Sequence, residues 1–201
     1  MTIDPDPGQG GQTLLVAYES AVDRGPGYVE TVVKIEGGAR SATLPAHSGG
    51  LHPYVADALD RYDFTVEGVT TIDAERTFLD KLLILHSRQC YYRDRGTVFR
   101  DANRESRHYY DVAMMADQPL VGRALADGTL RADVIRHSRL AFPSGWARFE
   151  EAEARELQVV PEGGLREALR RDYVRMADMI LGDAPKFEWV MGKVEAVARR
   201  L

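Results

Sequence analysis

Two charged residues interrupt apolar helical segments near the middle of the chain, and their types suit phosphoryl-transfer chemistry. Lys81 lies in a segment with apolar residues at i, i+4 and i+7 and others beside them, namely Phe78, Leu82, Leu85, Leu79, Leu83 and Ile84. This spacing predicts a helix packed against a core, with the ammonium flanked by apolar neighbours. Asp111 lies in RHYYDVAMM, a second such segment, which Ser106 can cap. Phosphoryl transfer requires a cation and a carboxylate that converge on one cleft.

A purely structural interpretation of the same residues stays open at this point. Lys81 can lay its aliphatic stem along apolar surface, and Asp111 can pair with Arg107 one helical turn earlier. An exposed pair of this kind contributes little to stability. The functional interpretation makes a geometric prediction, which is that Lys81 and Asp111 lie within about 12 Å of each other and face a shared cleft.

Other charged residues are candidates for binding phosphate or metal. From Arg88 to Arg107 the sequence carries six arginines against three acids, in a connection that we expect to be rich in turns. Arg104 and Arg107 are expected to guide phosphate groups to the cleft, unless every arginine is paired with a carboxylate elsewhere. Glu36 ends a predicted strand and is either a metal ligand or a solvent-exposed residue. Arg40, after a glycine pair, either reaches a phosphate or is simply exposed.

The elements that must position these residues predict an α+β protein. Residues 1–12, rich in proline and glycine, are typical of a flexible leader. Apolar and β-branched runs predict strands at 13–18, 28–36 and 66–72, and a short helix is expected at 51–59. From residue 74 onward the periodicity is helical, and turn signals divide it into five or six helices that include 119–126, 130–142, 165–181 and 187–201. We therefore expect a leader at 1–12, a small mixed sheet within 13–73 and a helical domain at 74–201.

Composition narrows the class of protein. A net charge of −5 argues against binding nucleic acid by bulk charge, although it leaves a local basic site open. The single cysteine, Cys90, excludes an internal disulfide and fits a reducing cytoplasm; we expect it to be incidental rather than a nucleophile. His47 and His52 have no third ligand at suitable spacing, so no zinc site is predicted there. No apolar run is long enough for a membrane span, and the first residues carry no export signal.

The order of these segments resembles one known family. ERTFLDKLLILH followed by SRHYYDVAMM is similar to a pair of segments in the AbiEii/AbiGii toxin family of nucleotidyltransferase-like proteins. The stretch VVPEGGLREALRRDYVRMADMILGDAPKFEWVMGKVEAV is similar to the C-terminal region of that family, and VVKIEGGAR to a strand of its catalytic domain. The resemblance covers nearly everything from about Val29 to the C-terminus.

The resemblance implies a function and roles for particular residues. Members resemble the toxin halves of two-gene toxin–antitoxin and phage-defence systems, and they transfer a nucleotide from a nucleoside triphosphate with Mg²⁺, in better-understood relatives to tRNA. By this resemblance Lys81 matches the helix lysine of the family and Asp111 its late catalytic aspartate. Glu36 is the only matched candidate metal ligand on the sheet side. The cleft would lie between a nucleotidyltransferase-like sheet and the helices, and a cognate antitoxin is an implied partner.

The chain departs from the family pattern in one respect. The first catalytic motif of the family, a Gly-Ser followed by an Asp-x-Asp that closes a strand, has no counterpart upstream of VVKIE; Asp4-Pro5-Asp6 has a proline between its acids and no Gly-Ser before it. We therefore expect a member that lacks the N-terminal catalytic segment and is impaired in transfer. Two hypotheses follow. One is a nucleotidyltransferase toxin acting on RNA or protein, and the other is a non-catalytic remnant or module that binds an antitoxin or a nucleotide.

Overall fold

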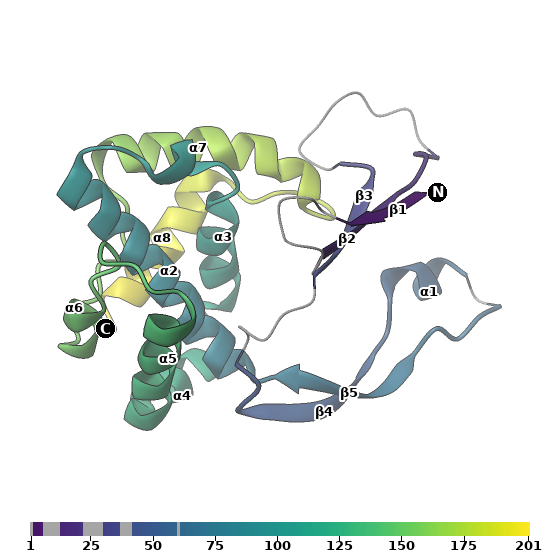
Figure 1. Ribbon diagram of the computed structural model, residues 1–201, viewed down its shortest axis with the longest axis horizontal. Coiled ribbons are helices and arrows are strands. Elements are labelled where there is room, and N and C mark those ends of the chain that lie inside the picture. Colours follow the sequence, from purple (N-terminus) through teal and green to yellow (C-terminus); the bar gives the residue numbers. More distant parts are fainter. Residues whose placement is uncertain (1, 6–12, 22–29, 37–41, 60) are drawn as a thin grey trace.

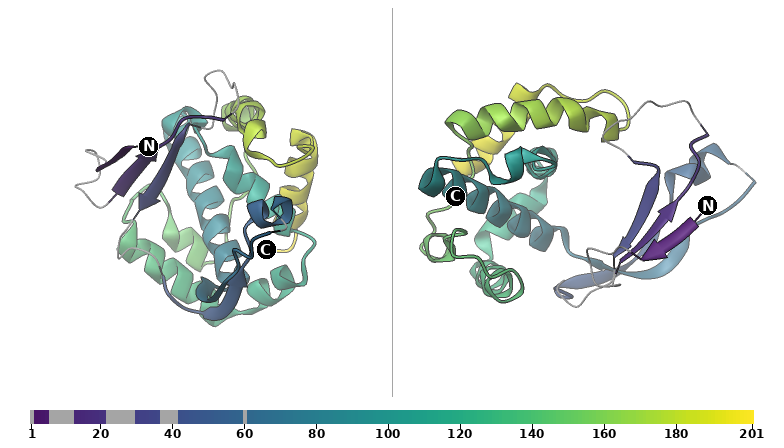
Figure 2. Two further views of the ribbon diagram at one scale, coloured as in Figure 1. Left: turned by 90° about the vertical axis from the view of Figure 1, so that its right-hand side faces the viewer. Right: turned by 45° about the horizontal axis from the view of Figure 1, so that its top comes forward.

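The computed structural model describes residues 2–5, 13–21, 30–36, 42–59 and 61–201. Two small antiparallel sheets lie at one end of the molecule, and a body of packed helices that contains the C-terminus forms the other end (Figures 1 and 2). The α+β class predicted from the sequence is confirmed. Whether residues 13–73 form a domain of their own stays a prediction.

The strands form two separate sheets instead of the single mixed sheet that we expected. The first has the order β1 (Thr2–Pro5), β2 (Thr13–Ala17) and β3 (Val32–Glu36), with β2 antiparallel to both neighbours. The second is a hairpin of β4 (Ala46–Leu51) and β5 (Val66–Ile72), with the short helix α1 (Tyr54–Ala58) between them. A parallel pair requires a long crossover connection, usually a helix, whereas strands that follow one another directly pair antiparallel.

Two of these strands lie where the sequence predicts irregular structure. Strand β1 falls inside the expected flexible leader, and its residues pair with β2 in the register Thr2 to Ala17. Proline at the end of an edge strand is compatible with such pairing because its missing N–H is not needed there. Residues 6–12 of the leader lie outside the described residues. Strand β4, AHSGGL, is polar and glycine-rich, and it is strand only because β5 supplies a partner.

Seven α-helices follow β5 in the described part of the chain, one more than the upper number that we predicted. Their bounds are α2 (Ala74–Arg95), α3 (Ser106–Met115), α4 (Pro119–Ala126), α5 (Gly128–Ala141), α6 (Phe149–Glu153), α7 (Gly163–Met176) and α8 (Phe187–Ala198). The additional helix is α6, which forms directly after the break at Pro143 and Gly145. Helix α7 ends before Leu181, because the chain tightens into a 3-10 turn, η3 (Ala177–Met179).

Helix α2 is the central element of the helical body, and it contacts α3, α4, α5 and α6 (Figure 1). No glycine or proline interrupts it, so it runs well into the arginine-rich stretch; the irregular connection starts only at Gly96. Gly96 adopts the left-handed conformation (φ 66°), and its N–H donates to Tyr92 O at 2.8 Å, which ends the helix. Arg93 and Arg95 lie in the last turn, where cations favour the helix dipole.

The glycine pair at the start of α7 is required by close packing. Gly163 has φ 50°, and a Cβ at this position would lie 2.9 Å from the hydroxyl oxygen of Tyr92. That hydroxyl accepts the N–H of Gly164 at 2.8 Å. The start of α7 is therefore held against the end of α2, and a side chain at residue 163 would be both strained and obstructed.

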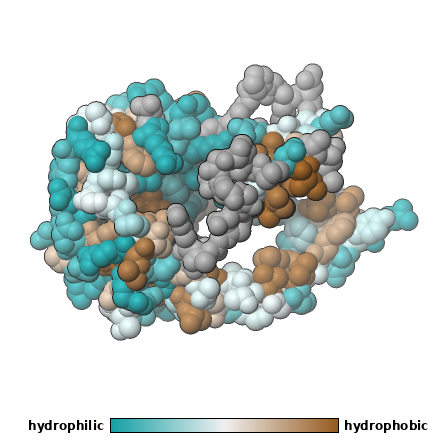
Figure 3. All heavy atoms as spheres, in the orientation of Figure 1, coloured by the Kyte–Doolittle hydropathy of each residue, from teal (hydrophilic) through white to brown (hydrophobic). Residues whose placement is uncertain are grey.

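The hydrophobic core belongs to the helices. Its buried members all lie between Phe78 and Val197, whereas Ile3, Val33 and Ile35 of the first sheet are each more than half exposed. Apolar surface is visible over β1–β3 and along the β4–β5 hairpin (Figure 3). The positions of side chains on α2 and α3 are therefore fixed by the helical body.

Candidate functional site

Lys81 and Asp111 meet in the structure. Lys81 Nζ donates to Asp111 Oδ2 at 2.6 Å, which confirms the prediction that the two side chains lie close together. Their side chains are 23% and 38% exposed, so the pair lies at the surface of the body with access from solvent. The alternative, pairing of Asp111 with Arg107, does not occur; Arg107 is exposed and has no carboxylate partner among the described residues.

A third residue, His108, completes this cluster. Its Nδ1 lies 3.3 Å from Lys81 Nζ. Burial lowers the pKa of His108 to about 3, and the positive charges of Lys81, Arg107 and Arg88 act in the same direction. The imidazole is therefore neutral, and its Nδ1 accepts from the ammonium. His108 was not among the residues predicted from the sequence, although its place three residues before Asp111 puts both on one helix face.

The start of α3 is fixed by a buried carboxylate from α7. Asp172, fully buried, accepts the N–H of Arg104 at 2.9 Å, the N–H of Ser106 at 2.8 Å and the hydroxyl of Ser106 at 2.6 Å. Ser106 is thus not the N-cap that the sequence predicts, because its hydroxyl donates to Asp172 instead of accepting from its own helix. This distant cap sets the position of α3 and with it the position of Asp111.

The arginines of the expected phosphate-guiding surface have divided roles. Arg88 is paired with Glu105 (2.7 Å), and Arg93 with Glu151 (2.8 Å), and both carboxylates are largely buried. Arg104 Nη2 lies 4.0 Å from Glu30 Oε1, and Arg104 itself adopts a left-handed backbone conformation (φ 59°). Arg107 directly precedes His108 in the chain. Its positive charge is close enough to the cluster to lower the pKa of His108.

The sheet-side candidates are not brought to the cluster. Glu36 Oε1 lies 2.8 Å from Lys34 Nζ on the same strand, and its side chain is 64% exposed. Within the described ranges, no hydrogen bond or ion pair joins Glu36 to Lys81 or Asp111. Arg40 lies outside the described residues. The functional roles of all these residues stay predictions.

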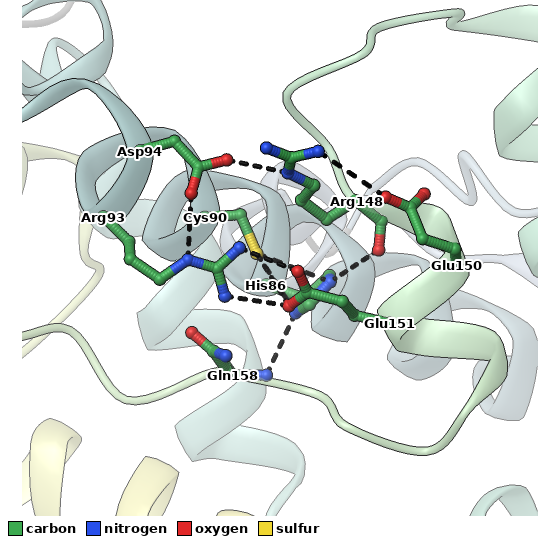
Figure 4. Close-up of polar contacts among 8 residues, drawn as sticks. All are labelled: His86, Cys90, Arg93, Asp94, Arg148, Glu150, Glu151 and Gln158. Carbon is green, nitrogen blue, oxygen red and sulfur yellow. Dashed lines mark hydrogen bonds and ion pairs between the residues drawn. The ribbon is translucent and has the colours of Figure 1, made fainter.

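A separate group on the other side of α2 offers metal-ligating atoms. His86, Cys90 and Glu151 place a ring nitrogen, a sulfur and a carboxylate oxygen within 4.8 Å of one another (Figure 4). The sequence places His86 and Cys90 one turn apart on α2, but Glu151 comes from α6 and no local pattern indicates it. Nitrogen, sulfur and carboxylate ligands are those that zinc accepts.

Each of these groups is already engaged. Both ring nitrogens of His86 are used, since Nε2 donates to Arg148 O at 3.1 Å and Nδ1 accepts the N–H of Gln158 at 3.0 Å. The Glu151 carboxylate accepts a hydrogen bond from each of the two terminal nitrogens of Arg93, both at 2.8 Å. Burial raises the pKa of the Cys90 thiol to about 11, so it is protonated. The polar contacts of this group therefore join α2 to the segment around α6.

The cluster of Lys81, His108 and Asp111 is thus the chemically accessible site. None of the helices in the described part of the chain combines the length and the apolar character that crossing a membrane requires.

Comparison with known proteins gives one family. The family model described as "Nucleotidyl transferase AbiEii toxin, Type IV TA system" matches residues 2–193. The search of curated proteins and the search of solved structures return no match. The matched range covers nearly the whole chain and contains both α2 and α3 with the Lys81–Asp111 pair. The chain belongs to the AbiEii family of nucleotidyl transferase toxins from type IV toxin–antitoxin systems.

Proposed function

We propose that Lys81 and Asp111 form the helical side of a nucleotidyl-transfer site that takes a nucleoside triphosphate as donor and RNA, such as tRNA, or a protein as acceptor. The observation that carries the proposal is the 2.6 Å contact between the two side chains, on the two helices that resemble the matching segments of the family. The reaction would take place in the cytoplasm, with cell toxicity and defence against phage as its outcome. A cognate antitoxin would be its genetic partner.

Lys81 has the properties of a triphosphate-binding residue. An ammonium carries three donors, and two of them are used by Asp111 Oδ2 and His108 Nδ1. The third is available to a phosphate oxygen. Because burial and nearby cations keep His108 neutral, the imidazole adds no repulsion against Lys81 and leaves the positive charge on the lysine. Arg107, which is exposed beside this cluster, and Arg104 would add positive charge around the phosphates.

Asp111 would take one of two roles. While it pairs with Lys81 it holds the ammonium in one orientation. A phosphate that binds Lys81 competes for that ammonium, and the released carboxylate can then accept the proton of an attacking hydroxyl. Asp172 supports either role, because it fixes the first turn of α3 and so the position of the helix that carries Asp111.

Nucleotidyl transfer generally uses a divalent metal, for which Mg²⁺ is our proposal, but the described residues do not by themselves fit such a site. Mg²⁺ prefers several oxygen ligands, and Glu36 is a single carboxylate paired with Lys34. The group of His86, Cys90 and Glu151 offers only one oxygen-bearing side chain, which Arg93 occupies. We therefore expect this chain on its own to transfer nucleotides at background level while still binding them.

A second candidate function follows from the same observation about Glu36. If the carboxylates for the metal are absent, the chain acts as a non-catalytic module that binds a nucleotide or an antitoxin through the same cluster. Nucleotide binding is common to both candidates, and transfer separates them.

The experiment measures binding and transfer in parallel. Binding of each nucleoside triphosphate, with magnesium present, is followed by calorimetry in the wild type, Lys81→Met, Asp111→Asn and Arg107→Glu. Lys193→Met is the matched control, because Lys193 also forms an ion pair with an aspartate, Asp117, on the same helical body but makes no ion pair with the cluster. Lys81→Met should lose binding by roughly tenfold or more and Arg107→Glu should weaken it, with a stronger effect at low salt.

One result would contradict the proposed site, and another would contradict the expected impairment of transfer. Equal affinity in Lys81→Met and Lys193→Met would exclude the cluster as the triphosphate site. Transfer of labelled nucleotide to total tRNA that disappears in Asp111→Ala would instead show that the chain is active, and that its metal ligands come from residues not identified above.

A further inference from the structure

A large cavity lies beside the central helix, and its lining excludes the proposed catalytic cluster. Its volume is about 660 Å³, within the usual range for small-molecule sites. It is open to solvent on one side and is lined by α2, α5, the turn η2 (Phe99–Ala102) and the segment from Phe142 to Phe149, with Ala42 and Ile72 at its margin. Among the described residues that line it, Lys81, His108 and Asp111 do not occur.

One end of the cavity holds an arginine with unused donors. Arg76 is 1% exposed, and its Nη1 donates to Leu44 O at 2.6 Å and to Asp133 Oδ2 at 2.7 Å. Its Nε and Nη2 are buried and have no hydrogen-bond partner. These two nitrogens form one edge of the guanidinium, the edge that matches a carboxylate with two parallel hydrogen bonds. Buried donors without acceptors are rare, so this edge requires a partner.

The same end holds a carboxyl group without a partner. Asp80 lines the cavity one helical turn after Arg76, and in the described part of the chain it makes no hydrogen bond or ion pair. Burial raises the pKa of Asp80, against the nearby positive charge of Arg76. An ammonium placed beside this carboxylate would remove the cost of burying it unpaired.

The rest of the cavity has an apolar and aromatic wall, although polar side chains such as Arg88, Arg100 and His137 also line it. Phe99 and Trp146 pack with their ring centroids 5.1 Å apart, and the guanidinium of Arg88 lies 4.0 Å from the centroid of Phe99. Leu83 and Ile84 continue the apolar wall along α2. The cavity thus has a positive charge, on Arg76, and a carboxyl group, on Asp80, at one end, and an apolar wall that can accept an apolar side chain.

We infer that this cavity binds a free α-amino acid with a large apolar or aromatic side chain. Its carboxylate accepts from Nε and Nη2 of Arg76, its ammonium donates to Asp80, and its side chain packs against Phe99 and Trp146. A simple organic anion would satisfy Arg76 but would be repelled by Asp80, and a simple amine would meet the opposite problem. Only a molecule with both charges satisfies both residues at once.

This binding site goes beyond the proposed nucleotidyl transfer and is tested independently of it. Calorimetry of the wild-type protein is carried out with L-phenylalanine, L-leucine and glycine, with phenylalaninamide, which lacks the carboxylate, and with 3-phenylpropanoate, which lacks the ammonium. Phenylalanine or leucine should bind, glycine should bind far more weakly, and each analogue should lose roughly tenfold or more in affinity.

Variants assign the site. Asp80→Asn should weaken phenylalanine but strengthen 3-phenylpropanoate, because that ligand has no ammonium to lose and the variant removes the negative charge that repels its carboxylate. The matched control is Glu156→Gln, which removes an exposed carboxylate outside the cavity. Lys81→Met should bind phenylalanine like the wild type, which separates this site from the triphosphate site. Thermal melting of each variant confirms that it is folded.

The inference is overturned if neither phenylalanine nor leucine binds the wild type. It is also overturned if the amide binds as tightly as the amino acid, or if Asp80→Asn and Glu156→Gln bind phenylalanine equally. Loss of amino-acid binding in Lys81→Met would place the ligand in the other cluster and would equally refute it.

Discussion

Replacing Asp172 by alanine tests how the site is positioned. The carboxylate of Asp172 is the acceptor for the N–H of Arg104 and for the N–H and hydroxyl of Ser106. Its partner on the exposed side, Arg175, lies 3.2 Å away and is 55% exposed, so that ion pair is screened by solvent and contributes little. The substitution removes the carboxylate acceptor of three donors, two of them on the fully buried Ser106, whose hydroxyl keeps only the weak sulfur acceptor of Met176 at 3.6 Å.

The magnitude follows from those donors. A buried donor left without a partner costs about 1–3 kcal/mol, so the two donors of Ser106 and the part-buried N–H of Arg104 together cost about 4 kcal/mol. Left-handed conformations at Arg100, Ala102 and Arg104 already strain this connection (φ 47°, 56° and 59°), and it has few other ways to hold its shape. With typical urea dependences, about 4 kcal/mol lowers the denaturation midpoint by about 1.5 M.

The assay is urea unfolding followed by circular dichroism of the helices. The control is Asp178→Ala, an exposed acid on η3, which should change stability by less than about 0.5 kcal/mol. Combining Asp172→Ala with Ser106→Ala should show a coupling of about 1–2 kcal/mol, because the hydroxyl bond is lost in both single variants. A loss below about 1 kcal/mol for Asp172→Ala would show that solvent or a rearranged α3 replaces the cap.

Three further predictions concern the buried groups. The folded state holds the pKa of His108 at about 3, against an ordinary 6.5, so the unfolded chain binds more protons between those values. Stability should therefore fall as the pH drops from 6.5 toward 3, by about 2 kcal/mol at pH 5, and this part of the dependence should vanish in His108→Asn when the two melting curves are compared. Cys90, buried with a pKa raised to about 11, should resist iodoacetamide at neutral pH in the folded protein and react once urea unfolds it; fast labelling of the folded state would mean that α2 opens there. Zinc should leave the melting temperature unchanged in the wild type, because Arg93 occupies Glu151, and a rise in melting temperature that depends on Glu151 would show that the metal displaces the arginine.

Local patterns were sufficient to predict the central helices and the closest pair of the site. The helical spacing of apolar residues around Lys81 predicted α2, and the same spacing around Asp111 predicted α3. Pro119 marks the first residue of α4, and β5 has the bounds predicted from its alternation. These features depend on residues a few positions apart, where sequence carries direct information about geometry.

The remaining features depend on contacts between distant residues. Asp172 lies on α7, and nothing in its neighbourhood indicates that it caps α3. The C-terminal end of α2 was misjudged because a run of charged residues resembles a connection, whereas the absence of glycine and proline lets the helix continue to Arg95. Asp73 stands at the N-cap position of α2, but its carboxylate accepts from His47, a residue of β4, instead of from the helix.

The cap that α7 provides has a consequence for the timing of synthesis. Ser106 and Asp172 are separated by 66 residues, so a ribosome working at about 5–20 residues per second makes the second about 3–13 s after the first. During that interval α3 has no acceptor for its first turn, and Asp111 has no fixed place beside Lys81. The nascent chain therefore gains the cap that holds Asp111 beside Lys81 only several seconds after α3 itself has been made.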